Sequence, residues 1–160
     1  MQMKTGVEQA VYAVMILTLL PERAVLPGDA ISEQLKTSPS YSQKLLRKLV
    51  SENLITSVPG AKGGFKLRKQ PEEICVYDIY LAIEGQQSLY SPSGIFDDLL
   101  DLEEEQCDCL LVTLMDEAES AWKTVLKRQT IANLLEDLQG SRYKEKIEKL
   151  QQVIIERMVL

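Results

Sequence analysis

The sequence predicts a mainly α-helical protein with a winged helix-turn-helix domain, a two-stranded wing, a long dimerisation helix and further C-terminal helices. Three observations predict this fold class. A short helix precedes a second helix with a cationic outer face, a glycine-tipped hairpin follows directly, and a long apolar stripe of helical spacing occupies residues 109–128. The expected organisation is a winged helix-turn-helix domain over residues 1–85, an acidic loop over 86–108 and a helical dimerisation region over 109–160.

The charge of the chain is split between its two halves. The 160 residues carry a net charge of −6, but residues 1–70 hold ten Lys and Arg against five Asp and Glu, and residues 71–160 hold eight against nineteen. Residues 36–69 alone contain eight cations and a single acid, Glu52. This asymmetry is typical of a basic module that faces a polyanion, joined to an acidic module with another role.

Residues 6–20 are expected to form a buried helix. The apolar residues that recur there at helical spacing are Val7, Ala10, Val11, Val14 and Leu17. Pro21 ends the pattern. The apolar run is interrupted by Glu8, is too short to span a bilayer and has no small-residue cleavage site behind it, so neither a membrane span nor a signal peptide is expected. A short helix over residues 30–35 and a turn come next.

The helix expected over residues 39–52 has one apolar and one polar face. Ser38 is a good N-cap, and Pro39 costs nothing in the first turn, where the backbone N–H has no helical partner. The buried side comprises Leu45, Leu46, Leu49 and Val50, and the opposite stripe comprises Ser40, Lys44, Arg47 and Ser51, with Gln43 beside it. Together with the short helix before it, this element predicts a helix-turn-helix.

Two short runs after this helix predict a two-stranded wing. Residues 54–58 and 65–68 have the character of strands, and apolar and cationic residues alternate in the second run. Gly60 and the Gly63-Gly64 pair supply the turn chemistry between them. Lys62 is therefore expected at the tip of the hairpin.

The rest of the chain is expected to be helical apart from one loop. A helix led by residues 71–74 ends at Gly85, and a loop rich in Ser, Gln and Gly then leads to the acidic stretch 97–108. The long helix over 109–128 carries an apolar stripe of the kind that packs against another helix. Two more helices follow, the first of them capped by Thr130.

The cationic helix face and the wing are candidate contacts for double-stranded DNA. A helix that enters the major groove needs cations that bind phosphates and polar side chains that read base edges. The candidates in the helix are Ser40, Tyr41, Gln43, Lys44, Arg47 and Lys48, and those in the wing are Lys62, Gly63, Gly64 and Lys66. Gln43 and Arg47 are expected to read bases, and Lys44 and Lys48 to bind phosphates. Scattered cations are usually a solvated face, but that interpretation does not explain why they fall on the helix and the hairpin together.

Several motifs resemble those of a known family. They are Ser40-Tyr41, Leu45-Leu46-Arg47-Lys48-Leu49, the wing run of residues 58–67, Pro71-Glu72-Glu73-Ile74 and Ala82-Ile83-Glu84-Gly85. In this combination the chain resembles the Rrf2 family of bacterial transcription regulators, which contains IscR, NsrR and CymR, over residues 3–85 and more loosely over 107–138. The resemblance implies a dimer that binds a palindromic operator, and the leading interpretation is a sequence-specific regulator that acts as a homodimer and a repressor. The resemblance also implies a dimer interface on the long helix, where the expected residues are Leu111, Leu114, Ala118, Ala121, Trp122 and Val125. Trp122 is expected to pack either in the dimer or against the winged helix-turn-helix domain.

The cysteines do not match those of the cluster-binding members of that family. By the resemblance, members that sense iron, nitric oxide or redox state hold an iron–sulfur cluster with three cysteines ahead of the dimerisation helix. Here only Cys109 matches those positions, and the chain has no His. A 2Fe–2S cluster or a zinc site needs four ligands, so neither a cofactor nor a metal is expected. A thiol redox switch at Cys107 and Cys109 stays open, although neighbouring carboxylates disfavour the thiolate. Cys75 is expected to be a small buried side chain.

Other interpretations come from different classes of protein. The winged helix could serve as a protein interaction module whose acidic half docks a regulatory protein partner. An enzyme is not expected, because the chain has no His, no phosphate-binding loop and no paired thiol and base. Three cysteines without an export signal indicate a cytoplasmic protein that does not associate with a membrane.

Overall fold

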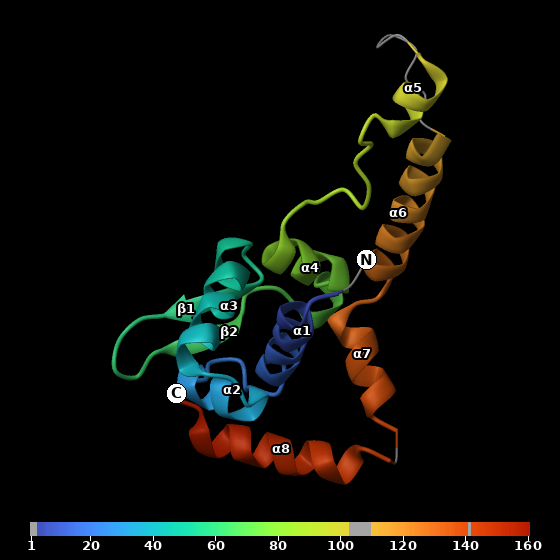
Figure 1. Ribbon diagram of the computed structural model, residues 1–160. Coiled ribbons are helices and arrows are strands. Elements are labelled where there is room, and N and C mark those ends of the chain that lie inside the picture. Colours follow the sequence, from blue (N-terminus) through green and yellow to red (C-terminus); the bar gives the residue numbers. More distant parts are fainter. Residues whose placement is uncertain (1–2, 103–109, 141) are drawn as a thin grey trace.

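The computed structural model describes residues 3–102, 110–140 and 142–160 and shows a helical body from which one long helix rises as an arm (Figure 1). The body contains α1 (Thr5–Leu17), α2 (Gly28–Leu35), α3 (Pro39–Ser51), β1 (Ile55–Val58), β2 (Gly64–Leu67), the 3-10 helix η1 (Pro71–Glu73) and α4 (Val76–Glu84). Then come α5 (Ile95–Leu100), α6 (Leu110–Arg128), α7 (Ile131–Leu138) and α8 (Lys144–Arg157). No helix in these described ranges is both long and apolar enough to span a lipid bilayer.

The core of the body forms around α1, which packs against α2, α3, α4 and α7. Its fully buried residues include Val7, Ala10 and Val14, in agreement with the predicted apolar spacing. The helix ends at Leu17, earlier than predicted. There the Thr18 hydroxyl donates to the Met15 carbonyl at 2.6 Å, a side-chain contact that competes with helix propagation.

The wing is an antiparallel hairpin of β1 and β2, as predicted. Ile55 on β1 lies opposite Leu67 on β2. The chain before α2 adds a pairing that the sequence did not predict, because Leu26 and Phe65 exchange two backbone hydrogen bonds of 2.9 Å. The wing is thereby anchored to the segment that enters the helix-turn-helix.

The arm joins the body through aromatic packing. Trp122 of α6 meets the Tyr80 ring edge-on, with centroids 4.7 Å apart, and meets the Tyr77 ring at 6.2 Å. The Lys127 ammonium lies 5.0 Å from the Tyr77 ring centroid, which is within the range of a cation–π interaction. Trp122, which the sequence assigns to the dimerisation stripe, therefore faces α4 of its own chain. The other five residues of that stripe turn outward.

A short helix, α5, lies where the sequence predicts an acidic loop. It occupies the far end of the arm and begins after Gly94, whose φ of 82° is a left-handed conformation that suits glycine (Figure 1). A helix of six residues is too short for its apolar periodicity to be recognised in the sequence. Residues 103–109, which include Cys107 and Cys109, lie outside the described residues.

The last helix, α8, runs back along the base of the body (Figure 1). Val25 and Val159 exchange backbone hydrogen bonds of 2.9 and 2.8 Å just after the helix ends. Arg157 forms an ion pair of 2.7 Å with Glu33 on α2. The sequence leaves open whether this helix packs, and the side chain of Ile154, which is 1% exposed, shows that it does.

Replacing Ile154 by alanine is expected to lower the free energy of unfolding by about 2 to 4 kcal/mol, because it removes a fully buried side chain between α8 and the body. Its neighbour Ile155 is 46% exposed, so Ile155→Ala should change that free energy by less than about 1 kcal/mol. Chemical denaturation of both variants measures the difference. Equal losses would show that α8 does not pack as described.

Candidate nucleic-acid interface

Helix α3 begins at the residue that the sequence predicts, and its buried and exposed faces agree with the predicted ones. The Ser38 hydroxyl accepts a hydrogen bond from the Tyr41 N–H at 3.4 Å, and Pro39 occupies the first helical position. The residues buried against the body are Ser42, Leu45, Leu46 and Leu49. The exposed residues include Ser40, Lys44, Arg47 and Ser51, so the polar stripe points to solvent.

A tight turn between α2 and α3 sets the direction of α3. Lys36 closes α2 in a left-handed conformation, with a φ of 52°, and the Thr37 N–H donates to the Ser32 carbonyl at 3.0 Å. This pattern of bonds satisfies carbonyls at the end of α2 and stops the helix there. The chain can then start α3 at Pro39 after only three intervening residues.

Lys48, which the sequence assigns to a phosphate contact, is engaged within the protein. Its Nζ donates to the Ile83 carbonyl at 2.6 Å. That carbonyl lies in the last turn of α4, where the helix dipole favours a cation. The ammonium of Lys48 therefore links α3 to α4, while the residue stays exposed, so its predicted phosphate contact stays a prediction.

Tyr41 and Gln43 lie at the edges of the exposed face, beside other helices. The Tyr41 hydroxyl is 3.0 Å from the point where a β-carbon on Gly6 of α1 would stand. The Gln43 amide oxygen is 3.3 Å from the corresponding point on Gly28, the first residue of α2. The glycines give these two side chains room, and both candidates keep part of their surface in solvent.

The wing presents its cations to solvent beyond the body. Lys62 is exposed in the hairpin turn, as predicted, and Lys66 is half-buried on β2 opposite Thr56. Arg68 and Lys69 are also exposed directly after β2. The sequence counted them in the basic stretch without selecting them as contacts. Their position next to a predicted strand of alternating cations is the signal that could have identified them.

Gly63 and Gly64 are explained by backbone packing. A β-carbon on Gly63 would lie 2.1 Å from the Val58 carbonyl oxygen, and one on Gly64 would lie 2.5 Å from the Leu26 carbonyl oxygen. Gly64 is also buried. Both residues are candidate DNA contacts by sequence, but their first requirement is the absence of a side chain where the hairpin closes and meets Leu26.

Gly64→Ala is expected to destabilise the protein by about 1 to 3 kcal/mol, because the new β-carbon overlaps backbone atoms that cannot move aside without shifting the wing. Gly140→Ala serves as the matched control, since a β-carbon there meets no atom within 4 Å among the described residues. Thermal unfolding of the two variants tests this. A Gly64→Ala protein as stable as Gly140→Ala would contradict the close packing of β2 against Leu26.

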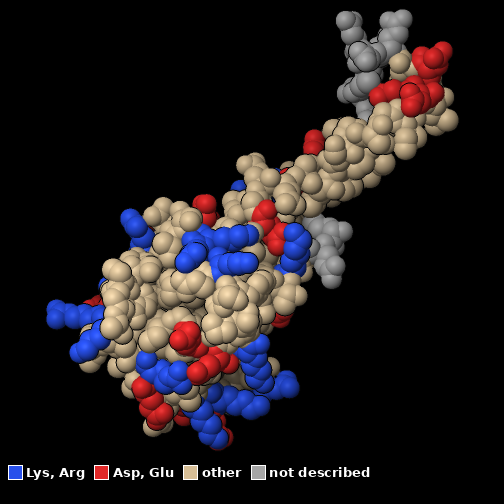
Figure 2. Space-filling view, turned by 60° about the vertical axis from the view of Figure 1, so that its left-hand side comes forward, with Lys and Arg blue, Asp and Glu red and all other residues tan. Residues whose placement is uncertain are grey.

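The cations of α3 and of the wing lie on adjoining elements, and we call them together the cationic surface, defined as Lys44, Arg47, Lys62, Lys66, Arg68 and Lys69. Figure 2 shows most of the visible Lys and Arg on the body, in several groups with Asp and Glu among them, whereas the arm is mostly uncharged and its far end is acidic. Among the described residues, none of these six cations forms an ion pair; the pairs present use Lys4, Lys123, Lys149 and Arg157. Unpaired cations on adjoining elements raise the local potential and attract phosphates.

The outward side of α6 is apolar and exposed. Leu111, Leu114 and Val125 are 49%, 57% and 52% exposed, and Ala118 and Ala121 lie between them on the same side. The opposite side of the helix, with Met115, Trp122 and Leu126, is half-buried toward the rest of the chain. A continuous exposed apolar stripe of this kind marks a surface that a partner covers.

The described residues contain no set of groups suited to a metal ion. No cluster of three or more His, Cys, Asp or Glu side chains occurs among them. Cys75 is half-buried at the N-terminus of α4, where its N–H donates to the Asp78 carboxylate at 3.0 Å. Burial, and then the interaction of the thiol itself with the Asp78 side chain, raise the pKa of the Cys75 thiol. This thiol is therefore a poor source of thiolate at neutral pH.

Comparison with known proteins gives concordant matches. The family profile of Rrf2, described as "Iron-dependent Transcriptional regulator", matches residues 3–137. The candidate HTH-type transcriptional regulator YwgB of Bacillus subtilis (strain 168) is 38% identical over 158 residues, which make up 99% of this chain and 97% of YwgB.

Two solved structures share the fold. IscR of T. potens has a TM-score of 0.60 at 23% identity, over 86% of this chain and 88% of that chain. CymR of Staphylococcus aureus has a TM-score of 0.58 at 26% identity, over 82% of this chain and 95% of that chain.

Proposed function

Because this chain belongs to the Rrf2 family of transcriptional regulators, we propose that it acts as a homodimer that binds a palindromic operator and represses the adjoining genes. The chain is a helix-turn-helix transcription regulator and not an enzyme. The observation that carries the proposal is the cationic surface, whose side chains come from α3 and the wing, are exposed apart from the half-buried Lys66, and form no ion pair in the described part of the chain. A regulator of this kind works in the bacterial cytoplasm, where it meets DNA.

The exposed face of α3 suits the major groove. The groove of B-DNA is about 12 Å wide and admits one α-helix, whose side chains then reach base edges and phosphates. In the proposed complex Arg47 reads a base edge, with Gln43 beside it, and Lys44 binds a phosphate. Lys62 at the wing tip binds the neighbouring backbone, because the hairpin extends beyond the body (Figure 1).

The exposed stripe of α6 supports the proposed homodimer. Two copies that pair through the same apolar face are related by a two-fold axis. Each copy then presents its α3 to one half of the operator, so the two half-sites are inverted repeats. The structure contains a single chain, and the stripe of Leu111, Leu114, Ala118, Ala121 and Val125 is the surface that the second copy would cover.

The donor set of this chain does not fit the iron implied by the family description. Cys75 is half-buried at the N-terminus of α4, where its backbone is bridged to that of Thr130. A cluster ordinarily takes four protein ligands, usually thiolates, and the chain has only three Cys. With no His in the chain to complete the ligand set, the proposed regulator holds no iron–sulfur cluster.

Iron analysis of protein purified without air should find far less than one iron atom per chain. A stoichiometric iron content would refute the proposal that no cluster is bound.

Cys75 is expected to react slowly with iodoacetamide at neutral pH, because its raised pKa leaves less thiolate than a free cysteine has. The rate should keep rising above the pH at which the thiol of free cysteine is fully ionised. The measurement uses a Cys107→Ser/Cys109→Ser variant, so that Cys75 is the remaining thiol. Reaction as fast as that of glutathione at the same pH would contradict the described burial.

Selection from a pool of random double-stranded DNA tests the proposed function. The protein should enrich one sequence with two inverted half-sites, and transcription from a promoter that carries it should fall when the protein is added. Enrichment of a single half-site would contradict the dimer. Enrichment of no sequence would contradict specific DNA binding itself and would favour a role in protein interaction.

A further inference from the structure

A partly open cavity of about 460 Å³ lies where α1, the end of α2, α7 and α8 meet. Sites for small molecules in proteins typically measure about 300 to 1,000 Å³, so the cavity has a suitable size. Its wall is largely apolar, and the apolar side chains that line it include Met15, Ile16, Leu35, Leu138, Ile147 and Leu150. Among the described residues, those that line it belong neither to α3 nor to the wing.

Gln9 of α1 also lines the cavity. Its Oε1 atom has no hydrogen-bond partner in the described part of the chain, but that atom is buried and does not face the space that a ligand could occupy. A ligand would therefore be held by the shape of the cavity and by its apolar side chains.

The charges around the cavity limit the class of ligand. Glu8 lies in the wall, and the described lining residues include no Lys or Arg. A carboxylate or phosphate on the ligand would therefore face a negative side chain without a compensating cation, and it would lose its hydration in an apolar cavity. The wall favours a molecule without negative charge.

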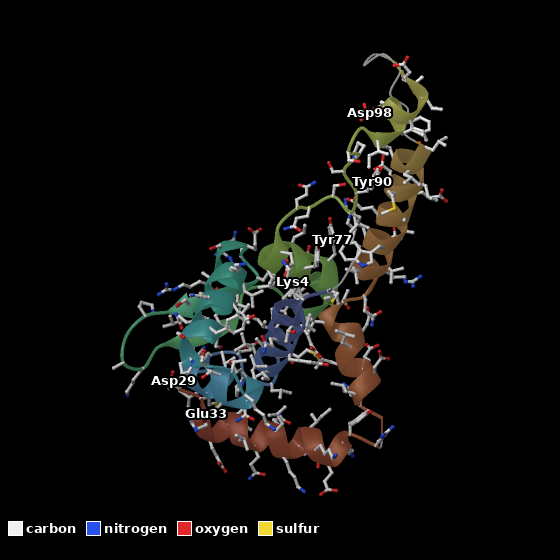
Figure 3. The ribbon with its side chains drawn as sticks, viewed as in Figure 1. Lys4, Asp29, Glu33, Tyr77, Tyr90 and Asp98 are labelled. Atoms are coloured by element: carbon white, nitrogen blue, oxygen red, sulfur yellow. The ribbon has the colours of Figure 1, made fainter. Side chains whose placement is uncertain are left out.

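From its size, its apolar wall and the absence of Lys and Arg among the described lining residues we infer that the cavity binds an uncharged, mostly apolar small molecule. Such a ligand would touch α2, the first helix of the helix-turn-helix, and α7, which follows the arm. Figure 3 shows Asp29 and Glu33 of α2 beside the end of α8, where Arg157 pairs with Glu33. α8 thus forms one wall of the cavity and is also tied by this ion pair to α2, the helix that precedes α3. An effector role for the ligand rests on the proposed function, whereas binding does not.

Two fluorescent probes with the same ring system test the site. N-phenylnaphthylamine is uncharged, has one N–H donor and becomes fluorescent in apolar surroundings, and anilinonaphthalene sulfonate adds a negative charge. The full chain should bind the uncharged probe in the cavity at least about tenfold more tightly than the sulfonate, because the wall offers no cation. Equal affinity of the cavity for the two probes would overturn the inference.

Two variants locate the bound probe. Ile147→Trp fills the cavity and should abolish the binding of N-phenylnaphthylamine. Leu114→Ser, on the exposed stripe of α6, should leave it unchanged. Unaltered binding by a folded Ile147→Trp protein, or loss of binding in Leu114→Ser, would overturn the inference.

Leu138→Phe fills the same cavity from α7 and replaces Ile147→Trp if that protein does not fold. Leu138→Phe should also abolish the binding of N-phenylnaphthylamine, and a folded Leu138→Phe protein that binds the probe normally would overturn the inference. The measurements contain no DNA. A failure of the inferred site is therefore distinguishable from a failure of the proposed operator binding, and each can occur without the other.

Discussion

Replacing Lys44 and Arg47 together by alanine is expected to lower operator affinity at least about a hundredfold. An arginine that reads a base edge contributes about 1 to 3 kcal/mol of discrimination, a dimer carries two copies, and each lost lysine also gives up a phosphate contact. Both side chains are exposed on α3, and alanine is a good helix former, so the fold should persist. Titration of the selected operator with protein, at one fixed salt concentration, measures the loss.

The control for this prediction removes the same charge from another helix. Lys144 and Lys146 are exposed on α8, and the Lys144→Ala/Lys146→Ala protein has the same net charge as the Lys44→Ala/Arg47→Ala protein. It should bind the operator within about threefold of the original protein, since distant surface charges are largely screened. If both variants lost affinity equally, the cations would act through net charge and not through the proposed recognition face.

Leu114→Asp is expected to convert the dimer into a monomer and to reduce operator binding at least about tenfold. Leu114 is 57% exposed at the middle of the apolar stripe of α6, where a second copy would bury it. Two carboxylates buried without partners in that interface would cost several kcal/mol. Sedimentation equilibrium of the variant gives its mass directly, and the same protein can be tested for operator binding.

Ser120→Asp is the matched control on the same helix. Ser120 is exposed and lies off the apolar stripe, so the same new charge stays in water. This variant should remain dimeric and should bind the operator normally. A dimeric Leu114→Asp protein, or a monomeric Ser120→Asp protein, would show that the pairing face lies elsewhere on α6.

The elements that the sequence predicted correctly depend on residues close together in the chain. The start of α3 needs only Ser38 and Pro39, and the wing needs only strand alternation around a glycine turn. The exposed and buried faces of α3 follow from helical spacing alone. For this reason the recognition helix and the wing could be located without a structure.

The features that the sequence missed depend on partners far away in the chain. Lys48 looks like any exposed cation on α3 until its contact with Ile83, 35 residues later, is seen. For Trp122 the sequence left two places open, the dimer and the winged helix-turn-helix domain, and only the position of Tyr77 and Tyr80 decides between them.

The packing of α8 is a tertiary event of the same kind. It buries Ile154 against the body and brings Arg157 beside Glu33, 124 residues earlier. Local patterns define a helix and its faces, but they do not identify the surface that a face will meet. The cavity between α1, α7 and α8 is lined by segments that are far apart in the chain. No local motif in the sequence could therefore predict it.

The most direct test of the proposed interface is the salt dependence of operator binding by Lys62→Gln. The slope of log affinity against log salt changes by about 0.9 for each phosphate that a protein neutralises. Lys62 is exposed at the wing tip of each chain, so its loss from a dimer should make the slope shallower by roughly 2, and Lys146→Gln on α8 should not change it. A slope that Lys62→Gln leaves unchanged would contradict the account, because the wing would then not touch the DNA backbone.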